Sequence, residues 1–126
     1  MKNIILGSVL AVAAITSFSA NADPICTGAG LAVDGAEVTG ASTGGSFVRT
    51  NFTPKCSANV FLEGIDGGPT LYRVGSASAK GKTRFNGSTI GGAVAPVSTS
   101  DPKCAGANGK CEAGDAASAA GEAPSS

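Results

Sequence analysis

The stretch CSANVFLEGIDGGPTLYRV, residues 56–74, decides the fold because it contains a strand, a tight turn and a second strand in succession. Cys56, Ala58, Val60 and Leu62 occupy alternate positions, which is the two-residue period of a strand. Asp-Gly-Gly-Pro at 66–69 predicts a turn, and Leu-Tyr-Arg-Val at 71–74 predicts the returning strand. The first strand also carries Phe61 on its other face, so we expect it to be central in a sheet.

The sequence on both sides of this stretch also consists of short apolar runs broken by turn residues. Asp-Gly at 34–35 and Asn-Gly at 86–87 each lie between such runs and predict tight hairpin turns. Residues 46–52 alternate in character and are followed by Pro54, which predicts another strand. About six or seven short strands at this spacing predict an all-β fold, a small antiparallel sandwich or barrel.

Four cysteines predict two disulfides, because an even number in a small exported protein is normally paired. We expect Cys26 to pair with Cys56 and Cys104 with Cys111, since the second pair closes a short loop with a turn-forming Asn-Gly at 108–109. Spacing alone leaves the other pairings open. The cysteines lack the close ligand pairs of a zinc site, and neither a metal nor another cofactor is expected.

Residues 1–22 have the organisation of a cleaved export signal. Lys2 precedes an apolar run over residues 4–15, and small residues lead to a cleavage point after Ala22. The run is shorter than the roughly 20 apolar residues of a membrane-spanning helix, so no membrane span is expected. We therefore expect an exported protein, either periplasmic or extracellular.

The large apolar residues end at Val97, which divides the rest of the chain. We expect residues 23–97 to form the small β domain and residues 98–112 to form a linker and a short disulfide loop. Residues 113–126, built mainly from Ala, Gly and Ser, are expected to be a disordered tail. A core this small contributes only about 3–5 kcal/mol, so the disulfides are expected to hold the domain.

The charge composition excludes several classes of function. The chain has 9 basic and 9 acidic residues and no histidine. Without histidine there is no Ser-His or Cys-His nucleophile pair and no imidazole metal ligand. Nucleic-acid binding needs a clear excess of Lys and Arg, which is absent. The carboxylates match neither a calcium loop nor a glycosidase pair, so we expect no catalytic residue and no enzyme.

Lys80, Lys82 and Arg84, here called the basic triplet, form the densest charged feature of the sequence. On an extended strand the three side chains share one face, where they would contact an anion such as a phosphate or carboxylate group. The other interpretation is that they are solvated charges on an edge strand, which discourage unwanted pairing. Gly-Lys-Thr at 81–83 matches the end of a phosphate-binding loop, but the first glycine of that motif is missing.

Two functions remain. The composition favours a non-catalytic structural or assembly protein of the bacterial envelope or extracellular matrix, which associates with itself through sheet edges or with an envelope partner. Deletion of the expected strand at residues 31–38 would then stop assembly. The alternative is a monomeric periplasmic or secreted binding module for an anionic glycan, a lipid head group or a partner protein, in which the basic triplet makes the contact.

Overall fold

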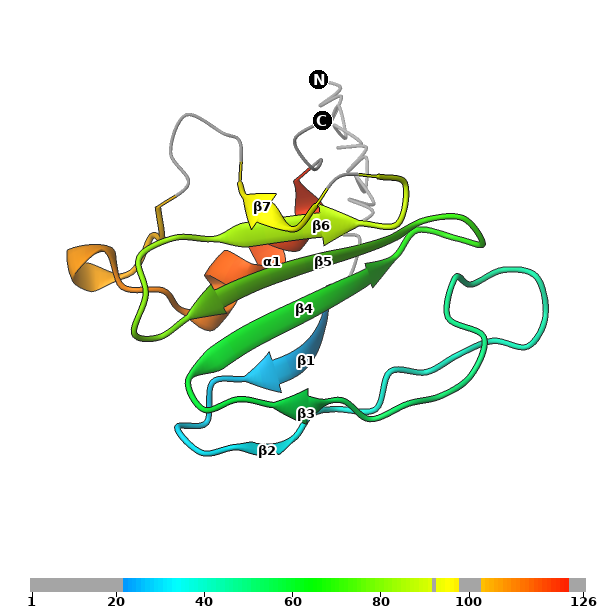
Figure 1. Ribbon diagram of the computed structural model, residues 1–126, viewed down its shortest axis with the longest axis horizontal. Coiled ribbons are helices and arrows are strands. Elements are labelled where there is room, and N and C mark those ends of the chain that lie inside the picture. Colours follow the sequence, from blue (N-terminus) through cyan, green and yellow to red (C-terminus); the bar gives the residue numbers. More distant parts are fainter. Residues whose placement is uncertain (1–21, 92, 98–102, 123–126) are drawn as a thin grey trace, which may run out of the picture.

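The computed structural model describes residues 22–91, 93–97 and 103–122. A five-stranded antiparallel sheet in the order β1-β4-β5-β6-β7 forms its centre (Figure 1). The strands of this sheet are β1 (Asp23–Thr27), β4 (Val60–Asp66), β5 (Tyr72–Ser78), β6 (Phe85–Ser88) and β7 (Ala95–Pro96). The other elements are a ribbon of β2 (Val33–Asp34) and β3 (Lys55–Cys56), the 3-10 helix η1 (Ala107–Gly109) and the helix α1 (Ala113–Gly121).

The β4–β5 hairpin is the longest pairing in the sheet, with a register from Val60 opposite Ser78 to Asp66 opposite Tyr72. The predicted turn at 66–69 joins the two strands. As predicted, β4 is central, because β1 and β5 flank it. It begins later than expected, since Asn59 has a φ of 62° in a turn that separates Cys56 from the strand. Cys56 therefore belongs to β3.

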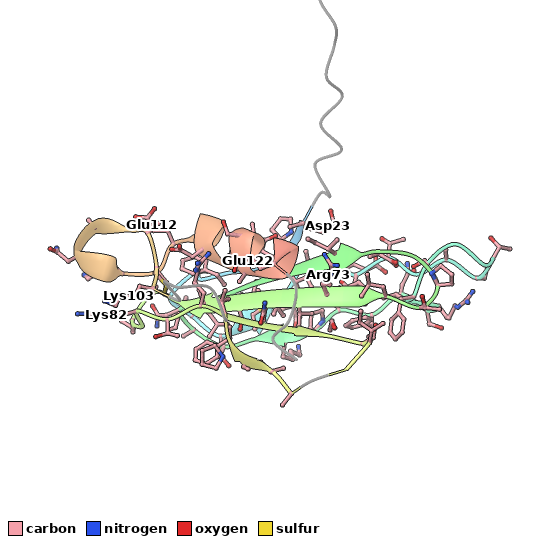
Figure 2. All side chains as sticks on the ribbon, turned by 90° about the horizontal axis from the view of Figure 1, so that it is seen from above. Asp23, Arg73, Lys82, Lys103, Glu112 and Glu122 are labelled. Carbon is pink, nitrogen blue, oxygen red and sulfur yellow. A yellow bond between two sulfur atoms is a disulfide. The ribbon has the colours of Figure 1, made fainter. Side chains whose placement is uncertain are left out.

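The helix α1 covers one face of the sheet, where it packs on β5, β4 and β6 (Figure 2). It buries only small side chains against the strands, and Ala116, Ala119 and Ala120 are fully buried. Gly75 of β5 lies directly beneath them. A Cβ atom at Gly75 would lie 2.9 Å from the carbonyl carbon of Ala119 and closer still to the backbone of the neighbouring helical turn. The helix can rest on the sheet only because this strand position has no side chain.

Residues 28–56, which we call the arm, form a long irregular excursion between β1 and β4. Its two sides pair at β2–β3 and again where Val38 bridges Phe52. The arm forms an apolar cluster with β1, whose buried members are Ile25, Cys26, Val38 and Cys56. Leu62 and Tyr72 of the sheet pack against this cluster.

The predicted all-β fold is right for the sheet and wrong for the whole chain. The described strands leave β1 and β7 at separate edges, so the sheet does not close into a barrel, and the structure does not confirm a sandwich. The expectation of a disordered tail is wrong for Ala113–Gly121, which is helical. Alanine is the best helix former, and the Asp115 carboxylate caps the helix by accepting hydrogen bonds from the backbone N–H of Glu112 (2.8 Å) and Ala105 (2.9 Å).

Both predicted Asx-Gly hairpins are wrong, because tertiary packing uses these glycines differently. Asp34 pairs with Lys55 in the ribbon, and a Cβ at Gly35 would lie 2.7 Å from the carbonyl oxygen of Ile25. The Asn-Gly at 86–87 lies inside β6, with Asn86 almost fully buried. The predicted strand at 46–52 is reduced to the single bridge at Phe52.

Both disulfides are present with the pairing that the sequence favours, Cys26 to Cys56 and Cys104 to Cys111. The first connects β1 to β3 and so ties the arm to the sheet. The second closes the loop that contains η1. Among the described residues, no helix is long and apolar enough to cross a membrane. The expected export signal, except for Ala22, and the expected linker over residues 98–102 lie outside the described residues.

Candidate functional site

The strand registers assign each side chain to one of the two sheet faces, because paired residues in an antiparallel sheet share a face and successive residues alternate. The face beneath α1, which we call the helix face, includes Phe61, Glu63, Ile65, Arg73, Gly75, Ala77, Asn86 and Ser88. The opposite face includes Val60, Leu62, Gly64, Asp66, Tyr72, Val74, Ser76, Ser78, Phe85 and Gly87. The charged and amide side chains thus concentrate beneath the helix.

The helix face holds polar groups that are largely removed from water. Glu63 is only 6% exposed and Asn86 only 2%. Burial raises the pKa of Glu63 above its ordinary value of 4.5, and the nearby charge of Asp23 raises it further. At the end of α1, the Arg84 guanidinium donates to the Glu122 carboxylate at 3.0 Å, with both side chains mostly buried. This ion pair connects the residue before β6 to the end of the helix.

The basic triplet does not lie on one strand face. Lys80 lies in the turn after β5, Lys82 lies exposed in the connection to β6, and Arg84 is engaged by Glu122. The structure instead brings Lys103 next to Lys82, through a bridge between Thr83 and Lys103 and a hydrogen bond from Cys104 N to Lys82 O at 3.0 Å. Figure 2 shows Lys82 and Lys103 at the same end of the molecule. An anion contact by these residues stays a prediction.

The sequence did not indicate Lys103, because its position next to Lys82 depends on a pairing between segments that are distant in the sequence. No alternation or motif predicts the bridge between residues 83 and 103. The nearest signal is the second disulfide, whose loop begins at Cys104.

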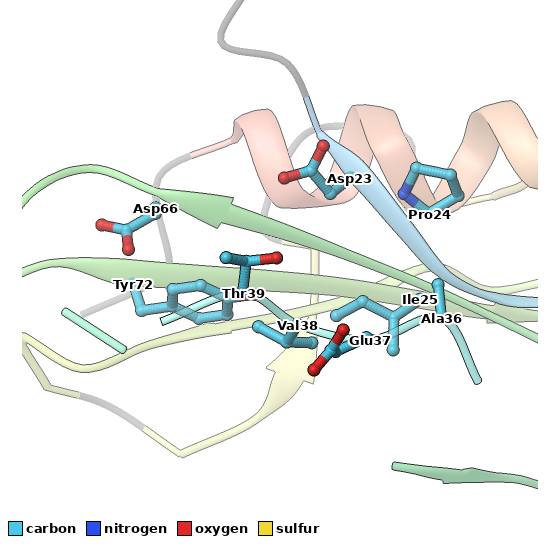
Figure 3. Close-up of a pocket in the computed structure, with 9 residues that line it drawn as sticks. All are labelled: Asp23, Pro24, Ile25, Ala36, Glu37, Val38, Thr39, Asp66 and Tyr72. Atoms are coloured by element: carbon cyan, nitrogen blue, oxygen red, sulfur yellow. The ribbon is translucent and has the colours of Figure 1, made fainter. Parts of the chain in front are cut away.

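A pocket of about 350 Å³ opens between β1, the arm and the ends of β4 and β5 (Figure 3). Its lining residues are Asp23, Pro24, Ile25, Ala36, Glu37, Val38, Thr39, Asp66 and Tyr72. Two of its three carboxylates already bind the arm. Asp66 accepts hydrogen bonds from Ser46 and from the backbone N–H of Phe47, and Glu37 accepts one from Asn51 at 3.0 Å.

The pKa values of two pocket groups, Asp66 and Tyr72, are shifted away from neutral pH. Burial acts to raise the pKa of Asp66, but hydrogen bonds from Ser46, Gly68, Phe47 and Val48 outweigh it and lower the pKa below 3.8. Burial and the charges of Asp23 and Asp66 raise the pKa of Tyr72 above 10.0. Tyr72 therefore stays protonated and Asp66 ionised near neutral pH. In the part of the chain that the structure describes, no group of three or more acidic or cysteine side chains is placed to hold a metal ion.

Both edges of the main sheet offer little backbone for pairing with another strand. β7 has only two residues, and one of them, Pro96, has no N–H to donate. On the outer side of β1, the Ile25 carbonyl accepts a hydrogen bond from Ala36 of the arm at 2.9 Å. The disulfide from Cys26 to the arm covers the same side.

The part of the sheet opposite α1 that extends beyond the arm is apolar and partly exposed. We call it the open face and define it by Val74, Ser76, Phe85, Gly87 and Val94. Val94 joins this face because a Cβ at Gly87 would lie 3.0 Å from its side chain and 3.7 Å from that of Val74. Phe85 is 38% exposed and Val94 is 67% exposed.

A scan against models of protein families, a search of curated proteins and a search of solved structures found no match to the chain.

Proposed function

We propose that the chain is an exported structural or assembly protein of the bacterial envelope or extracellular matrix, and that it acts without catalysis. The supporting observation is the amount of apolar surface on so small a domain. Among the described residues, seven large apolar side chains are exposed: Leu31, Val33, Phe47, Phe52, Phe85, Ile90 and Val94. Phe85 and Val94 of this set belong to the open face, and an apolar patch on a small protein marks a site where another molecule binds.

The covalent framework agrees with this proposal. Two disulfides in a small domain are typical of an oxidising, exported environment. They fix the arm and the loop after β7, so that exposed side chains are presented on a stabilised surface.

The test is the mass of the oxidised, exported chain, measured by light scattering on a sizing column over a concentration series. Assembly predicts a mass that increases with concentration, followed by ordered particles in electron micrographs. A mass of one chain at every concentration would refute self-assembly.

A second candidate is a binding module for an anionic glycan or lipid head group. The observation that favours it is the placement of Lys103 beside Lys82, which gathers lysines at one end of the molecule. Reversal of the charges at Lys80, Lys82 and Lys103 would abolish retention on a phosphate-bearing glycan or on anionic vesicles. If the variant binds as the unaltered protein does, this candidate is excluded.

A further inference from the structure

One face of the sheet is covered by α1, and the other presents large apolar side chains to solvent. α1 covers the buried polar groups Glu63 and Asn86 together with the apolar cluster of Phe61 and Ala77, whereas the open face presents Phe85 and Val94. In a sheet with one solvated side, the apolar side normally faces the core. On the open face, the segment between β6 and β7 lies over β6 at Gly87, where a Cβ would be 3.0 Å from the Val94 side chain, and Phe85 and Val94 remain exposed at its surface (Figure 2).

The charges at the two ends of the open face indicate what covers it. Asp66 lies on this side of the sheet at one end of the β4–β5 hairpin. Lys80 and Lys82 follow β5 at the other end and are exposed. The seven residues of β5 separate these ends by about 20 Å. Between them, the open face itself has no charged residue among those described.

We propose that the open face binds the open face of a second copy of this chain. The two sheets pack face to face about a two-fold axis that lies between them and runs across the strands. This axis reverses the strand direction, so that Asp66 of each copy faces Lys80 and Lys82 of the other. An axis along the strands would place like charges together. The sandwich expected from the sequence then forms between two molecules, and the inference rests on the proposed assembly function.

The experiment measures the dimer dissociation constant of the oxidised, exported chain by sedimentation. Val94→Lys and Phe85→Lys each introduce a charge into the apolar contact, and each is expected to raise the dissociation constant about tenfold or more. Phe52→Lys is the matched control, because Phe52 is also an exposed aromatic residue (50%) but belongs to the arm. It is expected to leave the constant within about twofold. Far-ultraviolet circular dichroism checks that each variant folds, and Val94, the more exposed position, carries the test if Phe85→Lys does not.

The charged ends are tested separately. Lys80→Glu combined with Lys82→Glu is expected to weaken the dimer, as is Asp66→Asn. Added salt should weaken the unaltered dimer more than the double variant. If salt and the double variant have no effect, the proposed arrangement is wrong.

The outcomes separate this inference from the function on which it rests. A dimer weakened by Val94→Lys but not by Phe52→Lys supports both. Assembly that tolerates Val94→Lys and Phe85→Lys but is lost in Phe52→Lys overturns the open-face dimer and leaves the assembly function intact. A chain that is monomeric at all concentrations overturns both.

Discussion

The two elements that cover the sheet, α1 and the arm, are held by different interactions. The arm meets β1 and β4 through branched and aromatic side chains, with Ile25 and Val38 buried around the Cys26–Cys56 disulfide. The helix meets β5 through alanines over Gly75, at a distance where backbone touches backbone. A cover made of large side chains depends on buried area and cross-links, whereas a cover made of small ones depends on exact spacing.

Removing the two disulfides tests the first half of this comparison and has the largest expected effect. The Cys26–Cys56 bridge spans 30 positions and Cys104–Cys111 only 7. In the chain-entropy description, the loss of the longer loop costs about 4 kcal/mol and the loss of the shorter about 2.5 kcal/mol. We expect Cys26→Ser with Cys56→Ser to lower the free energy of unfolding in urea by the larger amount.

The matched control is Cys104→Ser with Cys111→Ser, with mass spectrometry to confirm that the remaining bridge is intact. If the two double variants lose equal stability, the arm does not depend on its cross-link more than the helix region does.

Gly75→Ala tests the second half of this comparison, which is the close packing of α1 on β5. The added methyl would meet the backbone around Ala116, Ala119 and Ala120, and neither side has a flexible end that can move away. We expect a loss of about 3 kcal/mol in the free energy of unfolding, together with a loss of helical circular dichroism.

Gly114→Ala is the control on the helix itself, because a Cβ there has nothing within 4 Å. It should stabilise the protein by about 0.5–1 kcal/mol through helix propensity. Should Gly75→Ala behave like Gly114→Ala, the close packing of α1 on the sheet would be refuted.

The parts of the fold that the sequence predicted are those fixed by local pattern or by covalent chemistry. The turn at 66–69, the central strand around Leu62 and the even cysteine count are visible in the sequence itself. The helix α1 is not visible in the sequence as an amphipathic helix, because it has no large apolar residues at helical spacing. The signals that were present are the alanines at 116, 119 and 120 and the acidic pair Glu112 and Asp115 at the start.

The location of the basic triplet was missed for a different reason. Alternation at 80–84 fits a strand, but the chain turns after Ser78, β6 begins only at Phe85, and the described residues between them pair through a single bridge from Thr83 to Lys103. Arg84 forms an ion pair with Glu122, 38 positions away in the sequence. A pairing of this kind depends on where α1 docks, which no local pattern specifies.

Arg84→Met tests whether α1 is held to the sheet by an ion pair as well as by close packing, because it removes the Arg84–Glu122 pair. The Arg84–Glu122 pair is mostly buried, so the substitution leaves the Glu122 carboxylate without its partner. We expect a loss of about 1.5 kcal/mol in the free energy of unfolding. Lys82→Met, at an exposed position in the same connection, should change it by less than about 0.5 kcal/mol. Equal effects of the two substitutions would mean that the ion pair does not hold the helix.

The smallest effect concerns two carboxylates on opposite faces, whose pKa values shift in opposite directions. The pKa of Glu63 on the helix face is raised above 4.5 by burial and by Asp23, so above pH 4.5 the native state holds this proton more firmly than the unfolded state does. The free energy of unfolding therefore falls as the pH rises through the native pKa of Glu63. The pKa of Asp66 is lowered below 3.8, so its contribution is lost as the pH falls from 3.8 through its native pKa.

Acidification from neutral pH should thus first stabilise the protein through Glu63 and then destabilise it through Asp66. Urea unfolding between about pH 3 and pH 7 measures both the gain in stability through Glu63 and the loss through Asp66. Glu63→Gln should remove the gain on the way down to pH 4.5, because glutamine carries no charge to bury. Asp66→Asn should remove the part of the loss below pH 3.8 that its hydrogen bonds cause. If Glu63→Gln retains the full gain, the helix face does not hold a destabilised carboxylate, and the contrast between the two faces would be one of packing alone.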